Sequence, residues 1–285
     1  MADVYLNGEF LPVEQARISV MDRGFLFGDG VYEVIPAYGN RLFRLPEHLD
    51  RLGRSLAAIR LIDPLSAAEW QTLLQRLIDQ RLGEDQGVYL QVTRGPAPKR
   101  DHAIPAEVRP TIFAMANPIP PPDPTLAAGG AHAITLTDTR WIRCDIKAIT
   151  LLANVLLRQE AMDHDAIEAI LIRDGLATEG AASNLFVVHG GVLRTPPKGP
   201  LLLPGITRDL IVELAAAHSI DCREEPVSAE QLRSADEIWM TSSTKEIVPI
   251  TRLDEQVVGG GVPGPLWRRM TALYQDYKAR LRTES

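Results

Sequence analysis

A single lysine in the middle of the chain has surroundings that suit covalent chemistry. Lys147 lies between a strand-like stretch and an apolar run over residues 151–157. A lysine amine held away from water is a nucleophile that can form a Schiff base with an aldehyde or ketone. The alternative is a lysine whose ammonium group lies in solvent, and the local sequence leaves that alternative open.

Two segments could bind a phosphate group. Residues 204–208 (PGITR) open an amphipathic helical pattern, and the free N–H groups and the dipole at a helix N-terminus attract anions. Residues 241–244 (TSST) follow a predicted strand and carry four consecutive hydroxyl groups. Each segment also has a plainer interpretation, an N-cap at Thr207 in the first and a capped turn before Lys245 in the second.

Acidic and basic side chains supply the remaining candidates. Glu179 ends a short predicted strand, where its carboxylate could serve a site or lie in a surface turn. Arg100 and His102 lie two residues apart in a predicted loop. Together they could bind a carboxylate group, although a solvated loop would have the same spacing.

The glycine-rich segment 24–30 (GFLFGDG) is not a nucleotide-binding motif. The third glycine position of the dinucleotide fingerprint holds Glu33, and a strand rather than a helix follows. The Gly-Lys-Ser/Thr of a phosphate-binding P-loop is also missing. We therefore interpret this segment as a tight loop that precedes a strand.

Composition excludes several classes of protein. The chain has 285 residues, 45% of them hydrophobic and 24% charged, which is typical of a globular protein. A net charge of −7 argues against a general nucleic-acid binder. Cys144 and Cys222 form neither a disulfide framework nor a zinc-binding spacing, so we expect no metal. Without a signal peptide or a long apolar run, we expect a cytoplasmic enzyme with no membrane partner.

The elements that must position these residues form two halves. We predict an N-terminal small α/β domain over 1–116, a proline-rich linker over 117–124, and a larger C-terminal domain over 125–285. Strands and helices alternate without regular βαβ order, which indicates an α+β fold. Hairpin turns are predicted at 7–8 and 39–40, and helices at 46–60, 67–82, 148–163, 207–218 and 267–281.

Seven of these segments, in this order, resemble the motifs of the fold-type IV pyridoxal-phosphate enzymes. That family includes D-amino acid aminotransferases, branched-chain aminotransferases and aminodeoxychorismate lyases. Each motif is weak alone, but their common order over about residues 4–275 is specific. The motifs are 22–33 (DRGFLFGDGVYE), 47–52 (EHLDRL), 91–95 (QVTRG), 143–147 (RCDIK), 178–184 (TEGAASN), 205–208 (GITR) and 241–247 (TSSTKEI).

The resemblance implies a role for each candidate residue. Lys147 would form the Schiff base with pyridoxal 5′-phosphate and would then move the proton during transamination. Glu179 would bond the pyridine nitrogen and keep it protonated. The groups that would bind the cofactor's phosphate and ring face are Arg51, the backbone N–H groups of Ile206 and Thr207, the Thr207 hydroxyl, Ser243 and Leu203.

The resemblance also implies a whole-molecule arrangement. The fold would be the two-domain α+β fold of fold-type IV enzymes, with the cofactor between the domains. The C-terminal domain would be the larger, cofactor-binding one. The family is usually homodimeric, so we expect a homodimer.

Within this family the chain is most similar to D-amino acid aminotransferases. Their trap for the substrate carboxylate matches Tyr32, Arg100 and His102 here. The loop is one residue longer than the usual pattern, which leaves open whether Lys99 or Arg100 binds the carboxylate. Ala181 and its neighbour at 182 stand where serines are common, which puts a secondary hydrogen bond in doubt.

The implied reaction is ping-pong transfer of an amino group from a D-amino acid to a 2-oxo acid such as pyruvate or 2-oxoglutarate. Three alternatives remain. They are a transaminase of branched-chain L-amino acids or (R)-amines, an aminodeoxychorismate lyase, and a binding protein without enzymatic activity.

Overall fold

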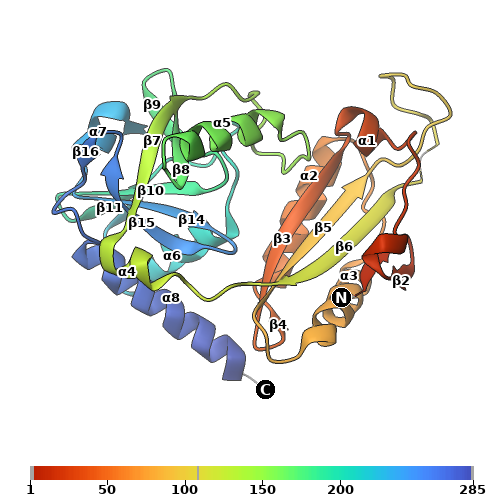
Figure 1. Ribbon diagram of the computed structural model, residues 1–285, viewed down its shortest axis with the longest axis horizontal. Coiled ribbons are helices and arrows are strands. Elements are labelled where there is room, and N and C mark those ends of the chain that lie inside the picture. The colour runs from red at the N-terminus through yellow and green to blue at the C-terminus, as the bar shows by residue number, and fades with distance from the viewer. Residues whose placement is uncertain (1–2, 108, 284–285) are drawn as a thin grey trace. The chain divides into compact units, whose positions relative to one another are not determined.

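The computed structural model describes residues 3–107 and 109–283, and its contacts divide the chain into two compact units. The first comprises Met1–Pro120, Ile146–Leu151 and Arg280–Ser285. The second comprises Pro121–Asp145 and Leu152–Ala279. Each unit contains a β-sheet and helices, which confirms the predicted α+β class (Figure 1).

The first unit is built on a six-stranded antiparallel sheet with the strand order β2-β1-β6-β5-β3-β4. Helices α2 and α3 pack on one face of this sheet (Figure 1). The elements of this unit are β1 (Val4–Leu6), β2 (Glu9–Leu11), η1 (Val13–Gln15), α1 (Arg23–Phe27), β3 (Gly30–Tyr38), β4 (Arg41–Leu42), α2 (Leu45–Ala58), α3 (Ala67–Ile78), η2 (Asp79–Arg81), β5 (Gln86–Thr93) and β6 (Thr111–Pro118).

Strand β3 divides its side chains between the two faces of the sheet. Val31, Ile35 and Ala37 are buried in the core beneath the helices. Because side chains alternate along a strand, Glu33 shares that face and Tyr32 points to the other. A carboxylate is therefore carried into the layer between the sheet and α2.

Helix α2 meets this strand through one stripe of buried side chains. The stripe has the three- and four-residue spacing of one helix face, and half of it is polar. Its members are Leu45, His48, Arg51, Leu52, Ser55 and Leu56. Of the polar members, His48 and Arg51 contact Glu33, whereas Ser55 contacts the Lys147 segment.

The segment containing Lys147 runs alongside the first residues of β3 and is bonded to them through its backbone. The N–H of Tyr32 donates to the carbonyl of Lys147 (2.9 Å), and the N–H of Ile149 donates to the carbonyl of Gly30 (3.1 Å). The N–H of Lys147 donates to Ser55 Oγ of α2 (3.2 Å). Because these backbone groups are engaged outside a helix, the helix predicted from residue 148 begins only at Leu152.

The glycine-rich segment forms a one-turn helix, α1, where a tight loop was predicted. Asp22 caps it by accepting a hydrogen bond from the Gly24 N–H (2.7 Å). Gly28 ends it in a left-handed conformation (φ 67°), and a Cβ there would lie 2.5 Å from Thr150 Cγ2. The glycine therefore permits both the helix end and the close approach of the Lys147 segment.

The second unit contains a ten-stranded mixed sheet. Its path is β12-β11-β10-β14-β15-β7-β8-β9-β13, with β16 paired to β15. Helix α5 contacts β7 and β8, and α6 contacts β12 and β14. The elements are α4 (Pro124–Gly129), β7 (Ala131–Thr137), α5 (Leu152–Asp163), β8 (Glu168–Arg173), β9 (Leu176–Gly180), β10 (Asn184–His189), β11 (Val192–Thr195), α6 (Ile206–Ala217), β12 (Cys222–Glu224), β13 (Val227–Ser228), α7 (Ala229–Arg233), β14 (Glu237–Ser242), β15 (Glu246–Leu253), β16 (Gln256–Val257) and most of α8 (Pro265–Thr283), whose residues from Arg280 on belong to the first unit.

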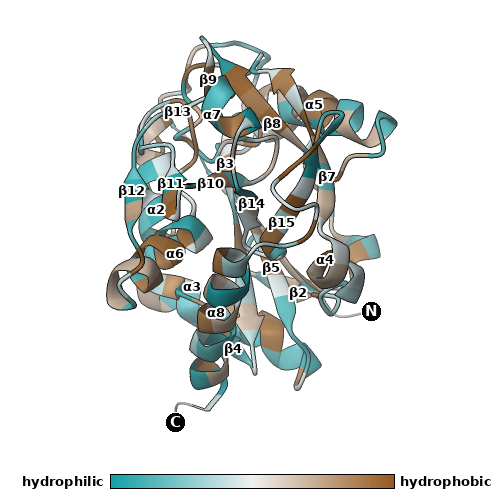
Figure 2. Cartoon of the chain, turned by 90° about the vertical axis from the view of Figure 1, so that its left-hand side faces the viewer, coloured by the Kyte–Doolittle hydropathy of each residue, from teal (hydrophilic) through white to brown (hydrophobic). Residues whose placement is uncertain are grey.

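The C-terminal helix α8 is amphipathic. Trp267, Met270 and Tyr274 are buried at helical spacing, and hydrophobic and hydrophilic residues alternate along the helix (Figure 2). Glu237 holds its first turn by accepting hydrogen bonds from the N–H groups of Leu266 (2.9 Å) and Trp267 (2.8 Å). A carboxylate at a helix N-terminus is favourable because it meets the positive end of the helix dipole.

None of the helices within residues 3–107 and 109–283 combines the length and the apolar character that crossing a bilayer requires.

Candidate active site

Lys147 lies against an aromatic side chain of the first unit. Its Nζ atom is 4.2 Å from the centroid of the Tyr32 ring, which in turn stacks on Tyr89 with the centroids 5.8 Å apart. Burial raises the pKa of Tyr89 to about 12, with a further contribution from Tyr32. The Lys147 backbone makes one bond to β3 and one to α2, and the Ile149 N–H adds a second bond to β3. The amine of Lys147 therefore projects from a well-held segment.

Three polar side chains of the first unit form a buried cluster. Glu33 Oε1 accepts from Arg51 Nε (2.7 Å), and Glu33 Oε2 lies 2.7 Å from Arg51 Nη2 and 2.8 Å from His48 Nδ1. Burial by itself would raise the pKa of Glu33, but the Arg51 charge and the hydrogen bonds outweigh it and hold that pKa well below its ordinary value. Burial lowers the pKa of His48, so its imidazole is neutral at physiological pH.

In this cluster Arg51, which the sequence predicts to bind the cofactor phosphate, is bonded to a carboxylate of the protein itself. Two of its three guanidinium nitrogens form a fork on Glu33, which fixes its orientation and compensates its charge. Its proposed role toward the cofactor phosphate therefore depends on Glu33 as a positioning residue. The sequence motif EHLDRL contains Arg51 and His48, but not the carboxylate that holds them.

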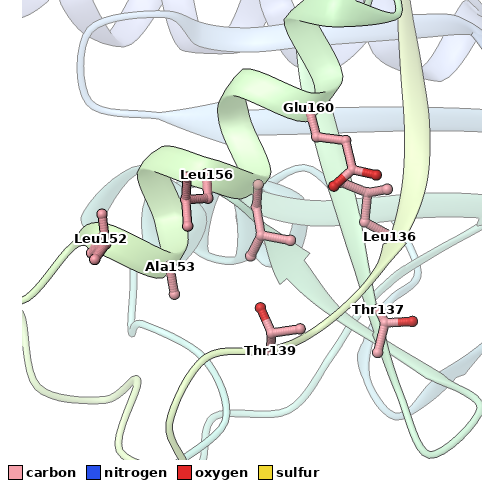
Figure 3. A pocket seen from close by; sticks show the side chains of 8 residues that line it. Leu136, Thr137, Thr139, Leu152, Ala153, Leu156 and Glu160 are labelled. Atoms are coloured by element: carbon pink, nitrogen blue, oxygen red, sulfur yellow. The ribbon is translucent and has the colours of Figure 1, made fainter.

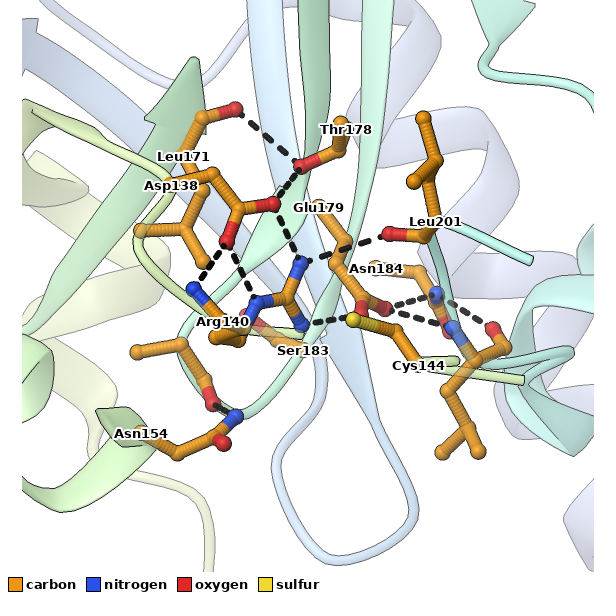
Figure 4. Close-up of polar contacts among 12 residues, drawn as sticks. Asp138, Arg140, Cys144, Asn154, Leu171, Thr178, Glu179, Ser183, Asn184 and Leu201 are labelled. Atoms are coloured by element: carbon orange, nitrogen blue, oxygen red, sulfur yellow. Dashed lines mark hydrogen bonds and ion pairs between the residues drawn. The ribbon is translucent and has the colours of Figure 1, made fainter. Parts of the chain in front are cut away.

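In the second unit, Glu179 is a buried carboxylate held by three donors (Figure 4). Arg140 Nη1 donates to its Oε1. Asn184 Nδ2 (3.1 Å) and the N–H of Leu203 (3.0 Å) donate to its Oε2. Asn184 also donates to the carbonyl of Leu203 (2.9 Å), so the segment before α6 is tied to the carboxylate.

Arg140 links Glu179 to a second carboxylate, Asp138. Its Nε and Nη2 donate to Asp138 at 2.9 and 3.0 Å (Figure 4). Burial would lower the pKa of Arg140, but the bonds to both carboxylates raise it overall, so it stays charged. The same burial raises the pKa of the neighbouring Cys144 thiol to about 11, which makes it a poor nucleophile.

The predicted phosphate-binding groups lie in the same unit as Glu179. Helix α6 begins at Ile206 and Thr207, so their N–H groups are in its first turn. A Cβ on Gly205 would lie 1.9 Å from Asn184 Oδ1, so glycine is required where Asn184 approaches. Ser243 lies in the turn between β14 and β15, shortly after Thr241, which pairs with Asn184.

In the loop after β5, Lys99 and Asp101 pair with each other, and Arg100 and His102 lie against Phe27. Lys99 forms an exposed ion pair with Asp101 (2.8 Å). The Arg100 guanidinium lies over the Phe27 ring (5.0 Å), and the His102 ring lies 5.3 Å from the same ring. Within the part of the chain that the structure describes, neither Arg100 nor His102 has a hydrogen bond, ion pair or ring contact with Tyr32.

Helix α5 carries an apolar surface beside a cavity of about 500 Å³ (Figure 3). Leu152 and Leu156 line this cavity, and 71% and 61% of their surfaces are exposed. Val155 and Met162 on the same helix are also exposed. Exposed large apolar side chains gathered on one helix are unusual for a surface that faces only water.

The sequence analysis missed four residues that organise these groups: Glu33, Asp138, Arg140 and Arg23. Arg23 and Glu33 both belong to the motif over 22–33 but had no role there, and Glu33 was also noted as a departure from the dinucleotide fingerprint. The spacing of Asp138 and Arg140, two residues apart before the lysine, was the available signal for that pair.

The chain is similar to aminotransferases of known sequence and structure. The sequence profile of the family described as amino-transferase class IV matches residues 30–253. The chain is similar to a D-alanine aminotransferase of Bacillus licheniformis, with 42% identity over 96% of each chain. It resembles the structure of Escherichia coli branched-chain amino acid aminotransferase, with a TM-score of 0.89, 30% identity, and coverage of 97% of this chain and 94% of that one. It also resembles the structure of branched-chain aminotransferase from the archaeon Thermoproteus uzoniensis with norvaline, with a TM-score of 0.87, 27% identity, and coverage of 99% and 96%.

Proposed function

The chain belongs to the class IV aminotransferase family, and from that membership we propose that it transfers the amino group of D-amino acids to 2-oxo acids. The observation that carries this proposal is the 42% identity to a D-alanine aminotransferase over nearly the whole of both chains. The structure of the branched-chain aminotransferase is less similar in sequence, at 30% identity. The branched-chain reaction therefore remains the alternative that the experiment below distinguishes.

We propose pyridoxal 5′-phosphate as the cofactor, because the residues present fit its three parts. An amine with a fixed backbone at Lys147 suits its aldehyde. The buried carboxylate of Glu179, which Arg140, Asn184 and the Leu203 N–H hold in place, suits a protonated ring nitrogen. The first turn of α6 and the turn at Ser243 suit a phosphate. When bound, this cofactor supplies the electron sink that stabilises a carbanion at the substrate α-carbon.

Two of the chain's own residues would carry the proton chemistry. The Lys147 Nζ would be the base that removes the proton from the substrate α-carbon and later returns it. The Glu179 carboxylate would hold the ring nitrogen of the cofactor. Arg140, Asn184 and the N–H of Leu203 fix the orientation of this carboxylate, so no reorganisation is needed during the reaction.

Arg100 and His102 would bind the substrate carboxylate, with Tyr32 as the third member of the trap. Lys99 is occupied by Asp101, which supports Arg100 rather than Lys99 as the binding cation. A guanidinium is also the better partner, because its donors match the geometry of a carboxylate.

We also propose that the protein is a homodimer. The exposed leucines of α5 and the adjoining cavity support this, because a second copy could bury them.

Half-reactions with single amino acids test the reaction. The cofactor-loaded protein is mixed in turn with D-alanine, D-glutamate, L-leucine and L-valine, without an acceptor, and the cofactor absorbance is followed. We expect the D-amino acids to convert the cofactor to its amine form at least tenfold faster than the L-amino acids. A faster reaction with L-leucine or L-valine would replace the proposed reaction with the branched-chain one.

A further inference from the structure

We propose that Arg23 is a positioning residue that holds the loop carrying Arg100 and His102, and that it thereby sets the affinity for the substrate carboxylate. This inference rests on the proposed function, because it assumes that Arg100 and His102 bind that carboxylate. It adds a residue from a separate segment of the chain, almost eighty positions earlier in the sequence.

The Arg23 guanidinium binds three consecutive carbonyl groups at the tip of the loop. Its Nη1 donates to the carbonyls of Asp101 (2.6 Å) and Ala103 (3.3 Å), and its Nη2 donates to that of His102 (3.3 Å). In the described ranges, these three carbonyls accept hydrogen bonds from no other residue. Arg23 therefore holds the backbone around His102, together with a local bond from the Ala103 N–H to Asp101 Oδ1 (3.1 Å).

Arg23 itself is rigidly held. It is 4% exposed, its N–H donates to the carbonyl of Gly95 (2.9 Å), and its Nε donates to Asp29 Oδ2 (2.7 Å). Arg94 donates to both oxygens of Asp29, at 2.8 and 3.0 Å. Burial would raise the pKa of Asp29, but the hydrogen bonds from the two arginines lower it overall, so the anchor stays charged.

The Phe27 ring, on the same short helix, supports the loop side chains. The guanidinium carbons of Arg23 and Arg100 lie 4.9 and 5.0 Å from its centroid, and the His102 ring lies 5.3 Å away. Cations are attracted to the face of an aromatic ring. Helix α1 thus contacts the loop backbone through Arg23 and the two functional side chains through Phe27.

The base of the loop is closed independently of the Arg23 guanidinium. Thr93 pairs with Thr111 at the ends of β5 and β6, and a Cβ on Gly95 would lie 1.9 Å from the carbonyl oxygen of Arg109. Loss of the Arg23 contacts should therefore loosen the tip while β5 and β6 stay paired. Binding a carboxylate would then have to order Arg100 again, and that entropic cost weakens affinity without changing the proton-transfer groups.

A pair of matched ligands tests this inference on the cofactor-loaded protein. Aminooxyacetate and O-methylhydroxylamine both react with the aldehyde carbon of the bound cofactor, but only the first has a carboxylate. The ratio of their rate constants, followed by absorbance, measures carboxylate recognition separately from cofactor reactivity. The variants are R23K and R100A. The matched control is R17K, the same substitution at the exposed Arg17.

For R23K we expect the ratio to fall about tenfold and the KM for D-alanine to rise by a similar factor, with kcat within about threefold of the original. Trypsin should also cleave R23K faster than R17K after Lys99 or Arg100, a readout independent of turnover.

An unchanged ratio in R23K, with a reduced ratio in R100A, would overturn the inference and leave the proposed function intact. An unchanged ratio in R100A would instead overturn the proposed carboxylate role of Arg100. If R23K does not fold, F27L replaces it and should lower the ratio at least threefold. An unchanged ratio in F27L would contradict the proposed support of Arg100 and His102 by the Phe27 ring.

Discussion

Two buried glutamates of this protein are each bonded by an arginine, but in different ways. Glu33 accepts hydrogen bonds from two nitrogens of Arg51 and also lies beside His48 Nδ1. Glu179 receives one nitrogen of Arg140, whose other two donating nitrogens bind Asp138. Arg140 is thus shared between two carboxylates, whereas two nitrogens of Arg51 bind one carboxylate.

Replacing Glu179 by glutamine should separate cofactor binding from turnover. E179Q preserves the shape of the side chain but removes the charge that would keep the ring nitrogen protonated. We expect the cofactor to bind and kcat to fall on the order of a hundredfold or more. The cofactor absorbance and steady-state rates with D-alanine check this. The matched control is E213Q on α6, and activity of E179Q within twofold of the original would show that another carboxylate serves the ring.

Lys147 should be the site of covalent attachment and the proton carrier. We expect K147A to lose attachment of the cofactor and all transamination. Borohydride reduction of the original protein followed by peptide mass mapping locates the modified residue. The exposed Lys198 gives the control K198A, which should keep both properties. An adduct on Lys99 or Lys245 would contradict the assignment.

At the residue scale, the sequence could point to isolated groups but not to their partners. Lys147 and Glu179 stand out because recognisable motifs surround them. Arg140 lies 39 residues from Glu179, and Arg51 lies 18 residues from Glu33, so only the folded chain brings each pair together. Such pairs are not visible in local spacing, because the contacts form between elements rather than within one.

At the scale of elements, β3 organises the first unit by its two faces. Glu33 points to α2, and Tyr32 points to the opposite face and meets Lys147. A shift of one residue in the register of β3 would exchange these two side chains. The buried bonds between Glu33 and α2 oppose such a shift, and they also hold the strand and helix together.

Replacing Glu33 by glutamine should therefore destabilise the first unit in a pH-dependent way. Removing one partner of a buried ion pair costs about 3 kcal/mol, so we expect E33Q to unfold at lower denaturant concentration at pH 7. The pKa of Glu33 is lowered from its ordinary 4.5 in the folded protein, so its stabilisation is complete above pH 4.5 and is lost as the pH falls below it. The difference between the two proteins should then shrink by about 1.4 kcal/mol per pH unit.

Denaturant unfolding of the cofactor-free protein at pH 7 and pH 3.5 measures this difference. The exposed Glu9 gives the control E9Q, which should unfold like the original protein at both pH values. A difference between the original protein and E33Q that stays constant from pH 7 to pH 3.5 would contradict a charged Glu33 as the source of the stability.

The sequence predicted most elements but misjudged two that adjoin Lys147. Apolar periodicity extended the helix of residues 152–163 back to residue 148, although the backbone of residues 147–149 is bonded to β3 and Ser55. The short helix α1 has too few residues for a helical period, so only its cap at Asp22 and its end at Gly28 identify it. In both places tertiary hydrogen bonds decided the local structure.

At the scale of the whole molecule, the apolar surface of α5 should be a contact between two copies. We expect light scattering to give twice the chain mass of 31.4 kDa for the original protein. L156E should be monomeric, because a buried carboxylate without a partner is unfavourable. The control is V257E, which changes a similarly exposed residue on β16 and should stay dimeric. A monomeric original protein, or a dimeric L156E, would contradict the proposed interface.

The discontinuous first unit has a consequence for biosynthesis. Its six-residue piece Ile146–Leu151 is separated from Pro120 by residues 121–145, and its last piece begins at Arg280. At roughly 5–20 residues per second, a ribosome needs about one to five seconds to add the intervening 25 residues. During that interval the N–H of Tyr32 and the carbonyl of Gly30 lack the partners they have in the finished protein. The nascent chain thus exposes an open strand end while it is still being translated, and in this period chaperones and proteases have access to it.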